Sequence, residues 1–449
     1  MSIESTAPKG WEIANLEDVV DILDSKRVPI NAKERGTRVG QVPYYGATGQ
    51  VGWIDDYLFD EELVLLGEDG APFLDAAKQK AYIVRGKSWV NNHAHVLRAR
   101  SNIPNAYIKY FLDTVDYHEF VSGTTRLKLN QAAMRRIPVP LAPRDERTRI
   151  VAEIDRQFSR HDEAVANLKR VKANLKRYKA AVLKAAVEGK LTEDWRKQHA
   201  DVEPAGELLE RILFERRAKW RGKGKYREPA KPDMSNLPPL PEKWKWASVD
   251  QLTSHITSGS RDWTRYYGRG IGSFILAQNV RLMRLDLSER QAVDPPKSDA
   301  ETIRTRVSIG DILVTIVGAK TGEVCRIPIE LVDHFVCQSV ALLRPLMAAS
   351  AKFMELYLAS PENGQAQWKH YIYGQGRPHL SFDQLKMTAI ALPPLAEQQQ
   401  IVADVERRLS VIEELESVVE ANLTRADRLQ QSILRQAFSG RLLFNGANG

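Results

Sequence analysis

Cysteine is scarce in this chain, which has only two in 449 residues, Cys325 and Cys337. A structural zinc site needs about four ligands in closely spaced pairs, and a disulfide-stabilised scaffold needs more cysteines than this. The nine histidines show no spacing typical of metal ligands. The sequence therefore predicts two buried, apolar thiols and no metal site.

Long apolar runs are also missing. No uninterrupted stretch approaches the roughly 18–20 residues that span a bilayer, and the start, MSIESTAPKGW, lacks a basic-then-apolar export signal. We therefore expect a cytoplasmic protein without a membrane segment. A content of 43% hydrophobic and 27% charged residues is typical of a folded globular protein, and the length suggests two to four domains.

Complete catalytic motifs are absent as well. AYIVRGKS (Ala81–Ser88) fits a loose phosphate-loop pattern, but its interior Tyr-Ile-Val is typical of a strand. The tetrapeptide Asp294–Lys297 lacks the final aromatic residue with which an amino-methyltransferase stacks on a flipped base. Asp24–Lys26 has the spacing of a nuclease acid–lysine pair without its supporting residues. The sequence thus predicts a protein that binds rather than catalyses, with no catalytic residues of its own.

What the sequence does contain is an internal repeat. LAPRDERTRIVAEIDRQF (141–158) matches LPPLAEQQQIVADVERRL (392–409) at an offset of 251 residues (392 − 141). The offset continues without a gap over 123–191 and 374–442, and PKGWEIA near the start resembles PEKWKWA in the second half. The chain is therefore predicted to be two copies of one plan.

The matched segments are predicted to be long helices of about 40 residues that pair with each other. Apolar residues recur close to every seventh position, with polar interruptions at His161, Lys172 and Glu416, so the heptad pattern is imperfect. Proline before each start and glycine near each end are the expected stop signals. The predicted seam residues are Ile154, Phe158, Val165, Leu168, Leu175, Val182, Val405, Leu409, Ile412, Val419, Leu423 and Ile433.

Charge indicates the direction of this pairing. Residues 168–190 contain eight Lys/Arg and one Glu, a net charge of +7, whereas residues 404–420 contain six acids and two Arg, a net charge of −4. Antiparallel packing sets the late half of the first helix against the early half of the second, so that these charges attract. The alternative is that both runs are solvated faces.

The front part of each copy is predicted to be a small α/β module. Strand-like runs at Glu62–Gly67, Ala81–Val84, Asp311–Gly318 and Ser339–Pro345 are followed in each copy by a short helix, NAYIKYFLDT or AKFMELYLAS. The fold class is α+β, with two modules joined by two long antiparallel coiled-coil helices in a pseudo-twofold repeat. The predicted boundaries are 1–140 for the first module, 141–191 for the first helical spacer, 192–240 for a linker with an amphipathic helix (Pro204–Trp220), 241–391 for the second module and 392–449 for the second helical spacer.

Basic, polar and aromatic residues gather in both modules, a pattern typical of nucleic-acid contact. Lys and Arg exceed Asp and Glu by 65 to 57, and SGSRDWTRYYGRG (258–270) interleaves arginine with aromatic residues, which makes it the strongest candidate for direct contact. Arg126 and Arg377 occupy matching turns, where the alternative is that they anchor each module to its helix. The predicted DNA-binding residues are Lys26, Arg27, Tyr44, Tyr45, Thr48, Arg126, Lys128, Ser258, Ser260, Arg261, Trp263, Tyr266, Tyr267, Arg269, Gln278, Asn279, Arg377 and His379.

Across essentially its whole length the chain resembles the specificity subunit of type I restriction-modification enzymes. The motifs that carry the resemblance are LPPLAEQQQIVADVERRL, AFSGRL, AGELLERILFERRAKW, LPPLPEKWKWA and GQGRPHLSFDQLK, together with the duplication itself. The first copy departs from the pattern at LAPRDERTRI, where charged residues replace the glutamines.

The resemblance implies two target-recognition domains at opposite ends of the helix pair, each of which reads one half of a split double-stranded DNA sequence. It implies no cofactor in this chain. Two modification subunits would bind S-adenosylmethionine and methylate adenine, and two restriction subunits would use ATP and magnesium to translocate and cut DNA. The rival hypotheses are a coiled-coil assembly scaffold whose modules bind protein, and a self-contained methyltransferase or nuclease.

Overall fold

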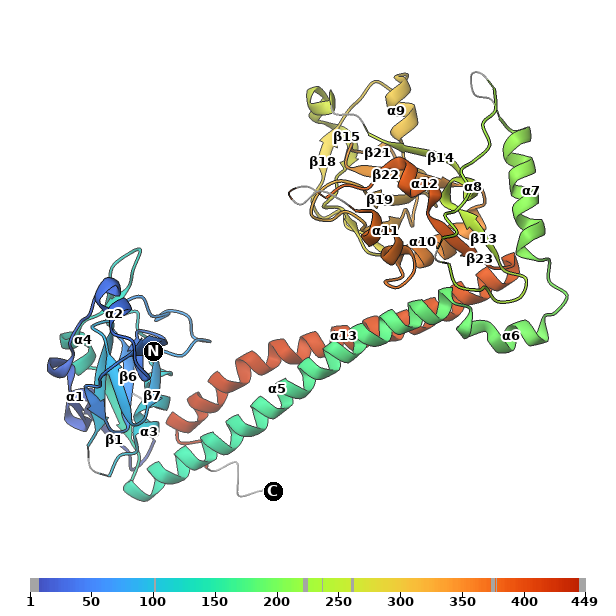
Figure 1. Ribbon diagram of the computed structural model, residues 1–449. Coiled ribbons are helices and arrows are strands. Elements are labelled where there is room, and N and C mark those ends of the chain that lie inside the picture. Colours follow the sequence, from blue (N-terminus) through green and yellow to red (C-terminus); the bar gives the residue numbers. More distant parts are fainter. Residues whose placement is uncertain are drawn as a thin grey trace. The chain divides into compact units, whose positions relative to one another are not determined.

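The structure is a computed structural model, which describes residues 8–100, 102–220, 225–235, 237–259, 262–372, 376 and 378–443. The chain divides into two compact units, one formed by Met1–Lys172 with Ser417–Gly449 and the other by Ala173–Glu416. Each unit contains one module and part of both long helices (Figure 1). In the described residues no helix is long and apolar enough to cross a membrane.

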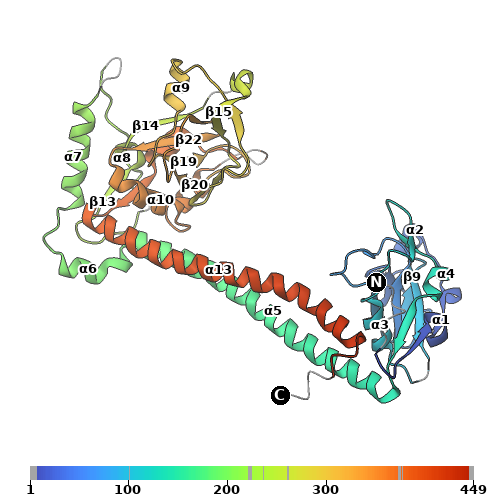
Figure 2. The same ribbon diagram turned by 180° about the vertical axis from the view of Figure 1, so that it is seen from behind.

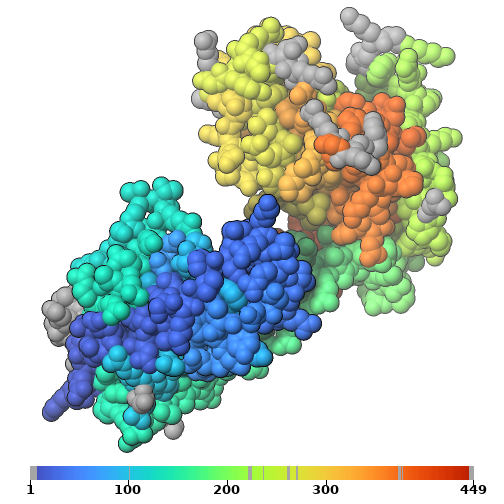
Figure 3. Space-filling model, turned by 60° about the vertical axis from the view of Figure 1, so that its left-hand side comes forward, coloured from blue at the N-terminus to red at the C-terminus, as the bar shows by residue number. Residues whose placement is uncertain are grey.

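The first module is built on two small sheets. One has the strand order β2-β9-β6-β7, and the other has the order β4-β3-β8-β5, in which β3 and β8 are parallel. In the space-filling view this module forms one continuous blue to turquoise surface (Figure 3). Its elements are β1 (Glu12–Asn15), α1 (Leu16–Val19), β2 (Val20–Ile22), η2 (Asp24–Lys26), α2 (Ala32–Thr37), β3 (Val42–Gly46), β4 (Gly49–Ile54), β5 (Phe59–Asp60), β6 (Leu63–Gly67), β7 (Ala81–Val84), β8 (Lys87–Val90), β9 (Ala94–Ala99), α3 (Asn105–Leu112), β10 (Val121–Ser122), β11 (Lys128–Leu129), α4 (Gln131–Arg135) and β12 (Pro138–Leu141).

The second module repeats this topology, except that its second sheet has three strands and, among the described residues, no counterpart of β5. Its four-stranded sheet has the order β14-β22-β19-β20, and its second sheet has the order β18-β15-β21, with β15 and β21 parallel. Its elements are β13 (Lys245–Ser248), α8 (Val249–Leu252), β14 (Thr253–Ser258), η4 (Asp262–Tyr266), β15 (Tyr267–Ile275), β16 (Val280–Arg281), β17 (Arg284–Leu285), β18 (Gln291–Val293), α9 (Ala300–Thr305), β19 (Ile312–Thr315), β20 (Val324–Arg326), β21 (His334–Val336), β22 (Val340–Pro345), η5 (Ala348–Ser350), α10 (Ala351–Ala359), α11 (Gly364–Tyr371), α12 (Phe382–Met387) and β23 (Ala389–Leu392).

Strand β6 shows why its sequence is continuously apolar. All five of its residues are buried, and alternate side chains point to opposite faces of the sheet. Val64 and Leu66 join the cluster that includes α3, whereas Leu63 and Leu65 join the cluster on the other face. Burial on both faces therefore requires the run LVLL, and the strands and short helices predicted from such runs are confirmed.

The segment after β7 excludes the phosphate-loop pattern. Residues 81–84 form this strand, Gly86 turns the chain with a φ of 69°, and the next element is strand β8. A phosphate loop requires a helix N-terminus at that point. The two cysteines are free and buried as expected, and burial raises the pKa of the Cys325 thiol to about 12.

Each module is connected to its long helix by an equivalent two-stranded ribbon. Strands β1 and β12 pair Glu12 with Leu141, and strands β13 and β23 pair Lys245 with Leu392. The long helices α5 (Arg144–Val187) and α13 (Leu395–Phe438), each of 44 residues, begin directly after these ribbons. The predicted duplication is therefore confirmed at the level of strand register.

The first turns of the two helices also match. Arg147 Nε donates to the carbonyl oxygen of Ala142 at 2.7 Å, and Gln398 Nε2, at the equivalent position, donates to that of Pro393 at 2.9 Å. In both copies a side chain in the first turn thus satisfies a backbone carbonyl just before the helix. Arg147 of the first copy thus preserves the role of Gln398, the glutamine at the equivalent position of the second copy.

The two long helices lie side by side (Figures 1 and 2) and are antiparallel within each unit. In the first unit, His161 Nε2 lies 2.9 Å from the carbonyl oxygen of Ala426, and Lys172 Nζ lies 2.5 Å from Glu420 Oε2, so the residue number falls on α13 as it rises on α5. The predicted antiparallel pairing is confirmed. Buried seam residues, as predicted, are Ile154, Val182, Val405, Leu409, Ile412, Val419 and Ile433.

Both long helices complete the core of each module. The start of α5 and the end of α13 enter the cluster of the first module, where the Phe438 ring packs edge-on against Tyr107 at 5.1 Å. The end of α5 and the start of α13 enter the cluster of the second module. The helix residues concerned are Ile150, Ile154, Ile433, Leu434 and Ala437 in the first unit, and Val182, Leu183, Ala186, Val187, Ile401, Val405, Leu409 and Ile412 in the second.

The segment between the two copies is bound to α13 through a buried carboxylate, that of Glu397. The segment contains η3 (Lys190–Thr192), α6 (Glu193–Gln198) and α7 (Ala205–Ala218), and α7 is the amphipathic helix expected from the sequence. Glu397 is 0% exposed and accepts hydrogen bonds from Thr192 Oγ1 at 2.6 Å, Arg196 Nη1 at 2.5 Å and Trp244 Nε1 at 2.8 Å. The carboxylate is therefore fully satisfied inside the protein.

Replacing Glu397 with alanine is expected to lower the free energy of unfolding by about 3–5 kcal/mol, because the Arg196 guanidinium loses its buried partner. Glu146→Ala is the matched control at the equivalent position of the first copy. The Glu146 carboxylate has no hydrogen bond or ion pair among the described residues, so this change should cost less than about 1 kcal/mol. Urea unfolding of the full chain measures both values, and equal losses would contradict the expectation.

Candidate nucleic-acid interface

In the first module, three of the predicted basic residues converge on two acids at the end of β6. Arg27 Nη1 donates to Glu68 Oε2 at 2.7 Å, and Lys128 Nζ lies 3.3 Å from Glu68 Oε1. Arg126 Nη2 donates to Asp69 Oδ1 at 2.8 Å. The pairing of strands β6 and β9 and the bridge between Asp69 and Lys128 bring these distant segments together.

Beside this cluster lies an open pocket of about 490 Å³. Thr48, in the turn between β3 and β4, is exposed, and Arg126 is 61% exposed at the side chain. Hydroxyl, amide and guanidinium groups at one opening can contact phosphates and base edges. The residues that line the pocket are Gly46, Ala47, Thr48, Val51, Asp69, Gly70, Asn91, His93, Thr125 and Arg126.

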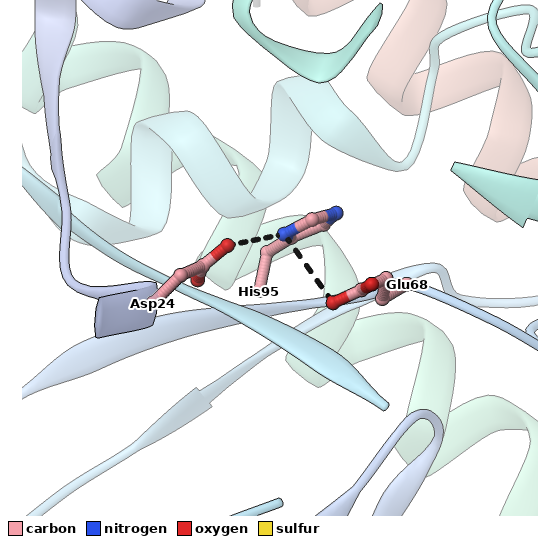
Figure 4. A group of neighbouring side chains, drawn as sticks. All are labelled: Asp24, Glu68 and His95. Carbon is pink, nitrogen blue, oxygen red and sulfur yellow. Dashed lines mark hydrogen bonds and ion pairs between the residues drawn. The ribbon is translucent and has the colours of Figure 1, made fainter. Parts of the chain in front are cut away.

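Beneath the basic residues lie Asp24, Glu68 and His95 (Figure 4). His95, 1% exposed at the side chain, has Nδ1 2.6 Å from Asp24 Oδ2 and 3.9 Å from Glu68 Oε2, and its Nε2 lies 2.9 Å from the carbonyl oxygen of Leu129. Both ring nitrogens therefore already face acceptors of the protein. Because Arg27 also balances the two carboxylates, the cluster is explained as an ion-pair network rather than as a metal site.

The charge state of Asp24 follows from this network. Burial alone would raise its pKa, but the hydrogen bond from His95, the backbone N–H of Val96 and the charge of Arg27 together lower the pKa below its ordinary value of 3.8. Asp24 is thus ionised in the folded protein. Its contribution to stability is complete above pH about 5 and is lost as the pH falls through the lowered pKa.

The two tyrosines predicted in this module lie under its surface. The Tyr44 ring is buried, donates its hydroxyl to the carbonyl oxygen of Ile30 at 3.3 Å, and packs 4.9 Å from the Arg35 guanidinium. Tyr45 is half-buried, with its ring 6.0 Å from that of Tyr82. Of the predicted residues in this module, Lys26, Thr48, Arg126 and Lys128 are the accessible ones.

In the second module the aromatic residues of 258–270 form part of the core. Trp263 is 2% exposed and stacks on Phe274 at 5.2 Å with an interplanar angle of 14°. Tyr266 and Tyr267 are half-buried against the same cluster. Trp263 therefore supports the loop from inside, whereas Arg265, on η4, is exposed with its guanidinium 4.7 Å above the Tyr266 ring.

The remaining predicted residues of the second module differ in accessibility. Asn279 is buried and donates to the carbonyl oxygens of Asp286 and Glu289, so it closes a turn. Gln278 beside it is exposed, Ser258 is half-buried, and His379 forms a β-bridge with Val317. Outside the described residues lie Ser260, Arg261 and Arg377, and also the side chain of Arg269.

Sequence reasoning missed the acidic and histidine partners of the basic cluster. Glu68, Asp69 and His95 follow or lie within strands, and nothing in their local sequence indicates that they meet Arg27, Lys128 and Arg126. The one available signal is Asp24–Lys26, whose spacing by itself indicates only a nuclease motif. In the structure Asp24 instead binds His95 and the backbone N–H of Val96.

The profile of the type I restriction modification DNA specificity domain family matches residues 8–177 and 301–420, which is more than half of the chain. The chain belongs to this family. DNA recognition without catalysis, rather than protein scaffolding, is the function that this membership supports.

Two curated relatives illustrate the similarity. The putative type I restriction enzyme specificity subunit S.HindORF215P from Haemophilus influenzae is 31% identical over 140 residues, which are 31% of this chain and only 35% of that protein. The EcoKI specificity subunit from Escherichia coli K12 is 25% identical over 356 residues, covering 77% of this chain and 68% of that protein.

Solved structures agree in fold. A chain from a study of complex assembly and conformational transition in a type I restriction-modification system superimposes with a TM-score of 0.64 at 16% identity, covering 97% of this chain and 99% of that chain. The HsdS subunit from Thermoanaerobacter tengcongensis superimposes with a TM-score of 0.53 at 16% identity, covering 97% and 98%. At this identity the likeness establishes the architecture of two modules and two long helices.

Replacing Arg27 with alanine is expected to destabilise the protein by about 3–5 kcal/mol, because Glu68 and Asp24 lose their buried cation. Lys26→Ala is the matched control at the neighbouring, exposed position and should change the free energy of unfolding by about 0.5 kcal/mol or less. Urea unfolding at pH 7 measures both. If Arg27→Ala leaves the free energy of unfolding unchanged, the ion-pair network contributes no net stability.

Proposed function

We propose that this chain is the specificity subunit of a type I restriction-modification complex and reads a bipartite double-stranded DNA target, one half with each module. The observation that carries the proposal is the duplication: two modules whose four-stranded sheets have equivalent strand orders, each connected by an equivalent ribbon to one of two antiparallel helices. Two equivalent readers on one chain fit a target with two recognised halves and an unread gap between them.

The partners and cofactors belong to the same proposal. Two modification subunits would bind S-adenosylmethionine and methylate adenine, and two restriction subunits would use ATP and magnesium. This chain would supply no catalytic group, and the complex would act in the cytoplasm. The names of the relatives, which are specificity subunits of restriction enzymes, support this assignment.

Within each module we propose that some residues contact phosphates and others contact base edges. In the first, Lys26 and Lys128 would contact phosphates, while Thr48 and Arg126 at the open pocket would contact base edges. The ion pair with Asp69 orients Arg126 before DNA arrives, which reduces the side-chain entropy lost on binding. In the second module Arg265 and Gln278 are the accessible candidates.

Arg126→Ala and Arg265→Ala are each expected to relax one half of the target and leave the other intact. A lost guanine contact should cost about 1–3 kcal/mol of discrimination at that position. The target is first established by mapping methylated bases in DNA from cells that carry the complete system. DNA protection by each variant complex then measures recognition of each half.

Arg211→Ala is the control for this experiment, because Arg211 is exposed on α7, outside both modules, and pairs with Glu203. It should leave both halves protected. Uniform weakening on every sequence would identify Arg126 or Arg265 as a phosphate contact. One continuous protected site without a gap would contradict the proposed function.

Adding four residues, about one turn, to both α5 and α13 is expected to lengthen the accepted gap by about one or two base pairs. One turn extends a helix by about 6 Å, and one base pair spans about 3.4 Å. The insertions belong between Lys172 and Ala173 and between Glu416 and Ser417, where most side chains are exposed. Methylation mapping of the variant system reports the gap.

The same insertion in α5 alone is the control. It shifts the seam of one helix against the other, so the paired contacts are lost and DNA binding should fall at both halves. If the gap between half-sites is unchanged in the doubly extended variant, the helices do not set the spacing between the half-sites. The assignment of each module to one half-site would remain.

A further inference from the structure

The duplication creates two equivalent sockets, and only one of them is filled by the described part of the chain. The second socket consists of Gly189, Thr192, Trp244 and Glu397, and Arg196 occupies it. An offset of 251 residues places Gly440, Leu443 and Glu146 at the corresponding positions of the first socket, and the motif PKGWEIA supplies Trp11 in place of Trp244. Each socket lies wholly within its own unit.

In the second socket Arg196 is held on several sides. Its Nη1 donates to Glu397 Oε1 at 2.5 Å and to Thr192 Oγ1 at 3.1 Å, and its guanidinium carbon lies 5.9 Å from the centre of the Trp244 ring. A Cβ atom on Gly189 would lie 2.8 Å from Arg196 Nη1, too close for ordinary contact, so the glycine makes room for the arginine.

The first socket has the same frame without the arginine. Gly440 has a φ of 72°, close to the 74° of Gly189, and the two glycines pack against the equivalent prolines Pro8 and Pro241. Between Trp11, Glu146 and Gly440 lies a pocket of about 310 Å³. Among the described residues, neither the Glu146 carboxylate nor the Trp11 indole N–H has a hydrogen-bond partner.

The equivalent positions of the first copy do not supply the missing cation. Leu443 stands where the second copy has Thr192, and the next six residues, FNGANG, contain no lysine or arginine. Lys9 and Arg149 both line the pocket, but among the described residues neither forms an ion pair with Glu146. Helix α6 of another molecule of this chain is not a suitable occupant, because its Arg196 already pairs with Glu397 of its own chain.

We propose that the first socket binds the start of a helix from another subunit of the complex, with an arginine that enters between Trp11 and Glu146 as Arg196 does between Trp244 and Glu397. Arginine suits the site better than lysine, because its planar guanidinium can pair with a carboxylate and stack on an indole together. The inference rests on the proposed function only for the identity of the complex.

A fluorescent synthetic peptide with the sequence EDWRKQH, residues 193–199 of this chain, is the probe for the first socket. Titrated against the full chain, it is expected to bind at one peptide per chain. Glu146→Gln in the chain and Arg196→Ala in the peptide should each weaken binding about tenfold or more, because each removes half of a desolvated ion pair. An Arg196→Lys peptide should bind with intermediate affinity.

Asp145→Asn is the matched control, because Asp145 is exposed in the same helical turn and does not line the pocket. It should leave the affinity unchanged. Peptide binding that is insensitive to Glu146→Gln but lost in Glu397→Gln would mean exchange into the second socket, and it would overturn the proposal. Absence of peptide binding at millimolar concentration would overturn it as well.

Assembly of the complete complex provides the second measurement. Glu146→Gln is expected to weaken association of this chain with its partner subunits about tenfold, whereas Asp145→Asn should assemble normally. Normal assembly of Glu146→Gln would overturn the inference and leave the DNA-reading function untouched. A continuous DNA footprint with intact peptide binding would overturn the function and leave the socket in place.

Discussion

The structure depends on the burial of both long helices in both module cores. Neither module has a complete core within its own sequence segment, because residues from the start of one helix and the end of the other fill it. Each fully buried apolar side chain contributes roughly 1.5–3 kcal/mol relative to exposure, so the helix residues in each core are a major part of its stability. Folding of either copy is therefore coupled to the other through α5 and α13.

Between the cores fewer residues of the helix pair are buried, and a polar residue contributes to the alignment. His161 occupies a seam position, is 9% exposed and lies within hydrogen-bond distance of the Ala426 carbonyl on the opposite helix. A buried polar group that must find its partner favours one register over neighbouring ones. The imperfection in the heptad pattern is thus part of how the pair is aligned.

Local patterns made much of the fold predictable. The offset between the copies, the heptad spacing and the apolar runs of β6 and β19 all act over a few residues, and the structure confirms the elements that they indicate. The site was harder to predict, because His95 meets Asp24 only after β2 pairs with β9. Trp263 shows the other difficulty: interleaved arginine and aromatic residues look the same in sequence whether the rings face inward or outward.

The acids beneath the basic cluster change what a polyanion would encounter. Arg27, Arg126 and Lys128 each lie within ion-pair distance of Asp24, Glu68 or Asp69, so much of their charge is already balanced inside the module. Counterion release scales with the phosphates that unpaired cations neutralise. Affinity at this surface should accordingly fall only gently as ionic strength rises, and discrimination between sequences would come from geometry more than from attraction at a distance.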